Sequence, residues 1–408
     1  MANKPKIRFK GFDDAWEQRK LGDLVGIYDG VHQTPEYQDS GIMFLSVENI
    51  ATLKSEKYIS KEAFERDYKV YPEKGDILMT RIGDVGTTNV VETAKKVAFY
   101  VSLALLKPNG INSYFLSNAM KTNAFQKGLR ERTLVTAIPQ KINKDEIGKI
   151  DIFITNNDVE QQKIGAYFST LDHLITLHQR KCDQMKELKK YMLKKMFPQN
   201  GAKVPEIRFD GFTDDWEQRK VSEIAIEKLS NGIMNNQSDG ETGVKHINVI
   251  NMYDTDKIHP EKLAFSNYEE DAVKKCNVEF GDIFLTRSSL KPEGIAEANV
   301  LLNSGRFVYD DHLIRVKVNK EKYDPFFVKL NLSGNAFKRQ FIVRAKTTAF
   351  TTIGQEDISE CLGSFPKKEE QQQIGECFMV IDHLITLHQH KCNELREIKK
   401  YMLKNMFI

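Results

Sequence analysis

The stretch Glu160–Phe197, EQQKIGAYFSTLDHLITLHQRKCDQMKELKKYMLKKMF, decides the fold, because it returns at Glu370–Phe407 as EQQQIGECFMVIDHLITLHQHKCNELREIKKYMLKNMF. The copies are identical at 25 of their 38 positions. Apolar residues recur every three or four positions over most of each copy, which predicts a helix with one apolar stripe. The stripe consists of Ile164, Phe168, Leu171, Ile175, Cys182, Met185, Leu188, Met192 and Met196, and of Ile374, Phe378, Ile381, Ile385, Cys392, Leu395, Ile398, Met402 and Met406.

Each helix would be roughly 57 Å long at about 1.5 Å per residue. Such a helix is too long and too narrowly apolar to pack alone, so we expect the two stripes to bury each other as an antiparallel coiled coil. The alternative is that each helix packs only on its own domain. The near-identity of the copies argues against this, because independent cores would have diverged.

A second repeat precedes each helix. Residues 7–24, IRFKGFDDAWEQRKLGDL, return at 207–224 as IRFDGFTDDWEQRKVSEI, and 11 of the 18 positions are identical. Trp16 and Trp216 lie in this pair, and we expect each to anchor the start of its unit against its own core rather than to stack on bases. The chain is therefore two tandem units of about 200 residues with an internal pseudo-twofold. We divide it into domain 1–158, helix 159–197, linker 198–206, domain 207–369 and helix 370–408.

The globular parts combine short strands with helices. Segments 42–47 and 74–91 predict strands joined by turns, and residues 280–300 of the second unit match segment 74–91. Residues 113–132 and 325–345 predict one helix in each unit. This alternation predicts mixed α/β domains. Asp158, three residues before Gln161, predicts a capping box for the first long helix. The linker PQNGAKVPE contains prolines and a glycine and cannot continue a helix. The chain begins with a similar segment, KPKIRF, so its order of parts resembles a ring of two units cut open at one of two equivalent junctions.

Composition limits the class of protein. The 408 residues have 40% hydrophobic content, a mean hydropathy of −0.47 and no run of about 18 apolar residues, which excludes a membrane span. The N-terminal MANKPKIRFKGF has no apolar stretch that would serve as a signal peptide, so we expect a cytoplasmic protein. Five cysteines without a CxxC pair suit reduced thiols. A net charge of +3 is too weak to predict nucleic-acid binding, so such a claim needs local patches.

The doubled layout, the EQQxI opening of each long helix and the Gly-Asp-Ile-x-x-Thr-Arg segments at 75–81 and 281–287 resemble the specificity subunit of type I restriction–modification systems. The resemblance implies two target-recognition domains, each reading one half of a split target in double-stranded DNA. The two units differ most in their loops while the helices barely differ, which predicts two different half-sites and hence an asymmetric target. The resemblance also implies that the helices set the gap and dock two modification and two restriction subunits. S-adenosylmethionine, ATP and Mg²⁺ would be used by those partners, for adenine N6-methylation and cleavage, and this chain would hold no cofactor.

The sequence contains no catalytic motif that would contradict this division of labour. There is no GxxxxGK[ST] phosphate loop and no Asp/Asn-Pro-Pro-aromatic motif of adenine methyltransferases. The segment GDVGTT at 83–88 lacks the lysine of a phosphate loop, so we interpret it as a turn. We therefore expect a non-catalytic chain. The alternatives are a two-headed coiled-coil adaptor without DNA specificity and, less favoured, a stand-alone methyltransferase or nuclease.

Candidate DNA contacts are hydroxyl side chains for base edges and cations for phosphates. They lie at strand ends and where a predicted helix enters a threonine-rich loop. The alternatives are that the arginines after the threonines pair with carboxylates of their own domain, and that the other cations only close helix C-termini. The candidates are Thr80, Arg81, Lys127, Arg130, Arg132 and Thr136 in the first unit, and Thr286, Arg287, Lys338, Arg339, Arg344, Lys346 and Thr352 in the second.

The long helices also contain two His-Cys pairs, His178 with Cys182 and His388 with Cys392. Antiparallel packing could bring two histidines and two cysteines together as a zinc set. We favour the simpler interpretation that the cysteines fill the core and the histidines mark the register, so we predict no metal.

Overall fold

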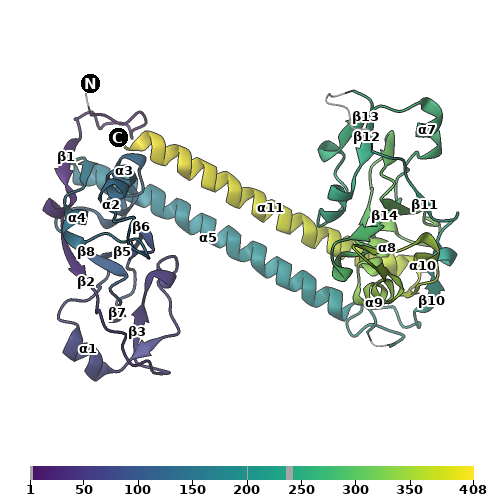
Figure 1. Cartoon of the computed structure of the whole chain (residues 1–408), viewed down its shortest axis with the longest axis horizontal. Coiled ribbons are helices and arrows are strands. Elements are labelled where there is room, and N and C mark those ends of the chain that lie inside the picture. The colour runs from purple at the N-terminus through teal and green to yellow at the C-terminus, as the bar shows by residue number, and fades with distance from the viewer. Residues whose placement is uncertain (1–2, 200, 236–241) are drawn as a thin grey trace. The chain divides into compact units, whose positions relative to one another are not determined.

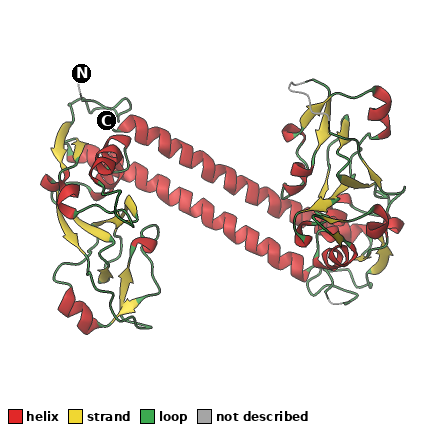
Figure 2. Cartoon of the chain, in the orientation of Figure 1, coloured by secondary structure: helices red, strands yellow, loops and turns green. Residues whose placement is uncertain are grey.

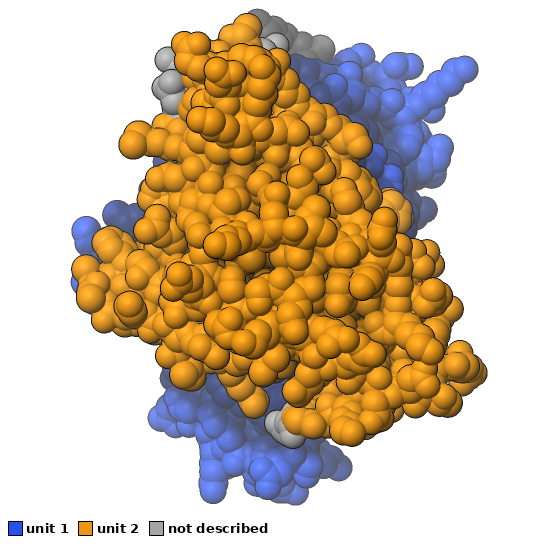
Figure 3. Space-filling model, turned by 90° about the vertical axis from the view of Figure 1, so that its right-hand side faces the viewer, with its two compact units in different colours: residues 1–179, 390–408 blue, residues 180–389 orange. Residues whose placement is uncertain are grey.

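The computed structural model describes residues 3–199, 201–235 and 242–408 (Figure 1). The chain divides into two compact units, residues 1–179 with 390–408 (unit 1) and residues 180–389 (unit 2) (Figure 3). The division falls within the two long helices, α5 (Asp158–Lys195) and α11 (Lys368–Met406). Each unit therefore combines a globular part of mixed helices and strands with one half of each helix (Figure 2).

The long helices run antiparallel to each other in unit 1. Lys399 of α11 lies 2.5 Å from the carboxylate of Asp172 on α5, and the Cys392 thiol donates to the carbonyl of Ile175 at 3.8 Å. From one contact to the next, the residue number on α5 increases while the residue number on α11 decreases, so the two helices run antiparallel.

The same pairing recurs in unit 2 with the helices exchanged. Lys189 of α5 lies 2.5 Å from Asp382 of α11, and the Cys182 thiol donates to the carbonyl of Ile385 at 3.9 Å. The stripe residues on both helices are buried or half-buried, except Leu188, which is 41% exposed. The predicted coiled-coil packing is therefore confirmed in each unit, apart from that position.

The globular part of unit 1 is built on a four-stranded antiparallel sheet. Alternate residues of its strands face two cores, one formed with helices (Ile77, Met79) and one formed with a second sheet (Leu78). The first sheet has the order β2 (Val25–Asp29), β8 (Leu103–Pro108), β5 (Ile77–Ile82), β6 (Asp84–Val90), and the second has β4 (Tyr58–Ile59), β3 (Ile42–Leu45), β7 (Val97–Phe99). A further pair joins β1 (Glu17–Lys20) to β9 (Asp151–Ile154).

Unit 2 repeats this plan and adds one small sheet. Its four-stranded sheet has the order β11 (Ser230–Asn231), β18 (Leu313–Val316), β14 (Ile283–Thr286), β16 (Ala298–Val300), beside β13 (Ala264–Ser266), β12 (Val244–Ile247), β17 (Phe307–Tyr309). The pair β10 (Glu217–Lys220) and β21 (Leu362–Phe365) matches β1 and β9. The added sheet consists of β15 (Ser288–Ser289), β20 (Thr351–Thr352) and β19 (Lys346–Thr347).

The helix predicted over 113–132 is two helices, α2 (Ser113–Ala119) and α3 (Asn123–Arg132), because the Thr122 side chain caps the start of α3. The helix predicted over 325–345 is likewise two, α8 (Pro325–Leu332) and α9 (Asn335–Arg344), separated at Gly334. The remaining helices are short: α1 (Lys61–Asp67) and α4 (Lys144–Gly148) in unit 1, and α6 (Val221–Ile224), α7 (Glu270–Lys275) and α10 (Gln355–Ser359) in unit 2.

The two repeated motifs bind each other. Arg8 forms an ion pair with the fully buried carboxylate of Glu160 at 2.5 Å, and Arg208 does the same with Glu370 at 2.7 Å. Trp16 and Trp216 are 2% and 3% exposed, so their predicted role as anchors of their own cores is confirmed. In each unit, the IRF segment and the EQQ opening therefore fix the start of a long helix to its globular part.

The start of α5 differs from the predicted capping box. The Asn157 side chain accepts from the backbone N–H groups of Val159 at 3.0 Å and Glu160 at 3.2 Å, so Asn157 is the cap and Asp158 is the first helical residue. Gln161 is used otherwise, since its amide donates to the carbonyl of Thr155 at 2.8 Å. The prediction was wrong by one residue because both Asn and Asp favour this position.

The two junctions that follow the long helices are equivalent. The N–H of Ile207 donates to the carbonyl of Lys195 at 2.9 Å, and the N–H of Ile7 donates to that of Asn405 at 2.8 Å. This supports the description of two units in a ring opened at one junction. Across the described residues, none of the helices is both long and apolar enough to cross a bilayer, and the five cysteines are free thiols.

Candidate nucleic-acid interface

Thr80 lies in strand β5 and Thr286 ends strand β14, and both side chains are fully buried. Each hydroxyl accepts a hydrogen bond of 2.9 Å from a backbone N–H across the hairpin, from Thr87 in unit 1 and from Glu297 in unit 2. These threonines hold the hairpins together. The prediction that they contact DNA is therefore corrected, because neither hydroxyl reaches the surface.

Arg81 also belongs to the interior of unit 1. Its guanidinium forms an ion pair with Asp29 and donates to the carbonyl of Ile142 at 3.2 Å, and the residue is only 6% exposed. Burial lowers the pKa of Arg81 from its ordinary value, while the paired carboxylate favours the charged form. Arg81 therefore pairs with a carboxylate of its own domain, which was the alternative interpretation of the sequence, and its prediction as a DNA contact is corrected.

Arg287, the counterpart of Arg81, is exposed in unit 2. Asn231 pairs with Ile314 in the same register in which Asp29 pairs with Ala104, so an amide replaces the carboxylate. Among the described residues, no ion pair involves Arg287. Its guanidinium is therefore available to a phosphate or a guanine edge.

The helix α3 delivers the predicted cations of unit 1. Lys127 is exposed and lies 3.9 Å from Glu131, and Arg132 is held 4.0 Å from Glu146. Arg130 is exposed and forms no ion pair within the part of unit 1 that the structure describes. Arg130 is therefore the cation of this patch with the least competition from carboxylates.

The loop after α3 is fastened to the hairpin that contains Arg81. The N–H of Gly83 donates to the carbonyl of Gln140 at 2.9 Å, and the Gln140 amide donates back to Gly83 at 2.9 Å. The exposed Thr136 lies in this loop. Gln140 and the exposed Lys141 were missed by the sequence reasoning, because only the long-range bridge from Ile82 to Lys141 places them here.

The cations of α9 in unit 2 fall into two groups. Lys338 donates to the carbonyl of Ile295 at 2.7 Å and forms an ion pair with Glu297 at 3.0 Å. Lys338 is thus held by its own domain, and its role as a DNA contact stays a prediction. Arg339 and Arg344 are exposed, and Arg344 lies near the Cys361 thiol, whose pKa burial raises to about 11.

The small sheet of unit 2 brings three predicted residues together. Thr352 of β20 pairs with Lys346 of β19 on one side and with Ser288 of β15, next to Arg287, on the other. Arg287, Lys346 and Thr352 are all exposed. Three segments far apart in sequence thus lie side by side and expose two cations and a hydroxyl, and Ser288 is the member that the sequence reasoning missed.

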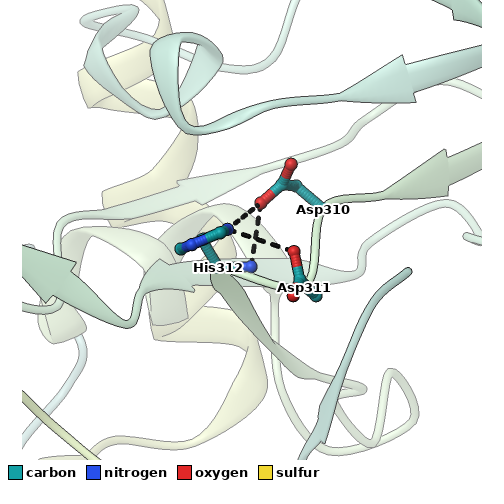
Figure 4. Close-up of side chains that lie close together, drawn as sticks. All are labelled: Asp310, Asp311 and His312. Atoms are coloured by element: carbon teal, nitrogen blue, oxygen red, sulfur yellow. Dashed lines mark hydrogen bonds and ion pairs between the residues drawn. The ribbon is translucent and has the colours of Figure 1, made fainter. Parts of the chain in front are cut away.

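A cluster of metal-ligand types lies beside this surface (Figure 4). His312 Nδ1 is 2.9 Å from the carboxylate of Asp310 and 3.1 Å from that of Asp311, and the His312 carbonyl accepts from the N–H of Arg287 at 2.8 Å. No other cluster of three such side chains occurs within residues 3–199, 201–235 and 242–408.

The buried Cys182 and Cys392 thiols face backbone carbonyls, as expected for core fillers.

Comparisons with known proteins agree along the whole chain. A family model described as the type I restriction modification DNA specificity domain matches residues 13–187 and again 213–397. A protein named as the MjaX type I restriction enzyme specificity subunit of Methanocaldococcus jannaschii is 25% identical, over 98% of this chain and 95% of that protein. The MjaVIII specificity subunit of the same organism is 22% identical over 95% and 91%. The crystal structure of a type I restriction–modification S subunit from M. genitalium has a TM-score of 0.69 at 14% identity and 99% coverage of both chains, which shows the same fold.

Proposed function

Because this chain belongs to the family of type I restriction–modification DNA specificity domains, we propose that its two units read the two halves of one split target in double-stranded DNA. The observation that supports this most directly is the contrast between shared framework and different loops. Both units have the same four-stranded sheet, yet only unit 2 builds the sheet of β15, β20 and β19 in the described residues. Different surfaces on one framework suit different half-sites, and hence an asymmetric target.

In unit 2 the reading surface is formed by Arg287, Lys346 and Thr352, with Arg339 and Arg344 of α9 supplying phosphate contacts. Arginine can donate two hydrogen bonds to the edge of guanine, and threonine suits several bases. In unit 1 the surface is formed by Arg130, Thr136 and the loop that ends at Lys141. With one fewer exposed arginine at the strand end, we expect unit 1 to depend less on guanine contacts.

The long helices serve as the spacer and as the docking site for partner subunits. Two modification subunits and two restriction subunits assemble there, and they bring S-adenosylmethionine, ATP and Mg²⁺ to adenine N6-methylation and DNA cleavage. This chain recognises the DNA sequence and contributes no catalytic group. The antiparallel pairing of α5 and α11 within each unit, through Lys399 with Asp172 and Lys189 with Asp382, gives each unit a docking face on its half of the helix pair.

The test is to express the chain with its cognate modification subunit in a methylation-free host and to map N6-methyladenine by single-molecule sequencing. We expect one split, asymmetric motif that disappears when this chain is omitted. A matched variant, Arg287→Ala, should relax one half of the motif and leave the other half intact. An assembled complex that methylates no motif would contradict the proposal and favour the adaptor alternative.

A further inference from the structure

A basic groove opens in unit 1 where the globular part meets the helix pair. It has a volume of about 660 Å³ and is lined by the start of α3, by α5 and by the last turns of α11. Five cations and a single carboxylate line it, together with the apolar Ile175 and Leu403. The charged lining residues are Lys121, Arg396, Lys399, Lys400, Lys404 and Asp172.

The positive charge of this groove is only partly neutralised. Lys399 takes the carboxylate of Asp172 at 2.5 Å. Lys121 is half-buried near them, and burial together with the nearby Lys399 lowers the pKa of Lys121 to about 8, against the opposing effect of Asp172. Among the described residues Lys121 forms no ion pair, so an anionic group entering the groove would be stabilised by its ammonium group.

The corresponding place in unit 2 shows what can fill such a groove. Lys189 and Asp382 are the counterparts of Lys399 and Asp172, and here the carbonyl of Thr255 accepts from Lys189 at 3.3 Å. The buried Lys329 donates to the carbonyls of Thr255 at 3.3 Å and Asp256 at 3.0 Å. Backbone carbonyls of the segment Asp254-Thr255-Asp256 therefore cover Lys189 and Lys329, while the carboxylates of that segment pair with Lys262 and His259.

The matching segment of unit 1 does not line the groove. The amide of Asn299 donates to the carbonyls of Asn251 and Asp254, and the amide of Asn89 donates in the same way to Ile50 and Ala51. These contacts align Asp254-Thr255-Asp256 with the stretch that begins at Ala51 and continues as Thr-Leu-Lys. None of these residues lines the groove, so the lysines of unit 1 are not covered by their own domain in the way that Lys189 and Lys329 are in unit 2.

We propose that the basic groove of unit 1 binds an acidic peptide segment of the modification subunit, whose carbonyl oxygens take the place of those of Thr255 and Asp256 in unit 2 and whose carboxylates pair with the excess of groove cations. The inference rests on the proposed function, which supplies that partner. A peptide fits better than a DNA phosphate backbone because Ile175 and Leu403 offer apolar contacts beside the cations. Unit 2, in which Lys189 is already covered, binds its partner without this segment.

The test compares two double variants at equivalent, exposed positions of the repeated helices. Lys400→Glu with Lys404→Glu reverses two charges of the groove, and Lys190→Glu with Lys194→Glu makes the same change in unit 2. Affinity for the purified modification subunit is measured by biolayer interferometry at several salt concentrations. We expect the groove variant to bind roughly tenfold more weakly and with less salt dependence, and the unit 2 variant to stay within about twofold of the unaltered chain.

Equal effects of the two variants, or none, would overturn the inference while the unaltered chain still binds the modification subunit and directs methylation. If the unaltered chain itself fails to bind, the proposed function fails instead. Affinity of each chain for duplex DNA is measured alongside, and a loss confined to DNA would make the groove a phosphate site and overturn the peptide. Carbodiimide coupling of the complex should join Lys121 or Lys400 to an Asp or Glu of the partner.

Discussion

Arg81 and Arg287 occupy the same position of the same motif in the two units, and they differ in nearly every physical respect. Arg81 is buried and paired with Asp29, whereas Arg287 is exposed and has Asn231 in place of that carboxylate. One change from carboxylate to amide separates an arginine that stabilises the sheet from an arginine that is available to a ligand. A repeated motif therefore conserves a backbone position without conserving the role of its side chain.

The largest effect of this difference should be on stability. Replacing Arg81 by Ala leaves Asp29 without its ion-pair partner, so we expect the free energy of unfolding of unit 1 to fall by about 3–5 kcal/mol. Replacing Arg287 by Ala should change that of unit 2 by less than about 0.5 kcal/mol. The protein has two tryptophans, so denaturant unfolding can be followed by Trp16 in a Trp216→Phe background and by Trp216 in a Trp16→Phe background.

The control is the double variant Arg81→Ala with Asp29→Asn. If the pair is the cause, the double variant should be less destabilised than the sum of the single ones, because no uncompensated charge remains. Additive effects would mean that Arg81 acts through its contact with Ile142 rather than through the carboxylate.

The helix ion pairs offer a second comparison of the units. Asp382 is only 4% exposed beside Lys189, whereas Asp172 is 45% exposed beside Lys399. Lys189→Met should therefore destabilise unit 2 by about 3 kcal/mol, and Lys399→Met should cost unit 1 less than about 1 kcal/mol. The same tryptophan-based unfolding experiment measures both. Equal losses would show that exposure does not control the strength of these pairs.

Unit 2 should also gain stability in alkaline solution through Lys329. Burial lowers the pKa of Lys329 from 10.5 to about 8 in the folded state. Between these values the unfolded chain binds more protons, so the contribution of Lys329 to stability rises with pH, is complete above 10.5 and is lost as the pH falls through 8. We expect the difference in unfolding free energy between the unaltered chain and Lys329→Met to change by about 3 kcal/mol from pH 7 to pH 10.5. A pH-independent difference would contradict the lowered pKa.

For DNA binding we expect smaller free-energy changes than for stability, and here Arg287 rather than Arg81 should be the residue that matters. Arg287→Ala should weaken binding to the methylated motif by about 1–3 kcal/mol if the guanidinium contacts a base edge. Arg130→Ala or Arg344→Ala should weaken binding less and reduce the salt slope by about one, as expected for a phosphate contact. Affinities are measured by fluorescence anisotropy at three salt concentrations. An unchanged affinity and slope would remove the residue from the interface.

The sequence predicted the parts of the fold in which a short-range pattern or a repeat determines the structure. The apolar stripe predicted the pairing of α5 and α11, and the duplicated tryptophans predicted two equivalent cores. The helix breaks at Thr122 and Gly334 were missed, because a long apolar pattern continues across them. Periodicity reports which face is buried but does not show where a side chain caps a new helix.

The candidate site was harder to predict, since its outcome depends on partners distant in sequence. Thr80 and Thr286 were expected at the surface, but each closes its own hairpin. Lys338 was expected to bind phosphate, yet Glu297 lies beside it only after folding. Local sequence marked the right loops and strand ends, whereas the availability of each side chain was decided by long-range pairing.

The central claim is that each unit reads its own half of the target from a shared framework. The most direct measurement replaces residues 207–367 by a second copy of residues 7–157, keeps both long helices, and maps N6-methyladenine with the cognate modification subunit. We predict a symmetric motif in which both halves match the half-site of unit 1. An assembled complex that still methylates the original asymmetric motif would contradict the account.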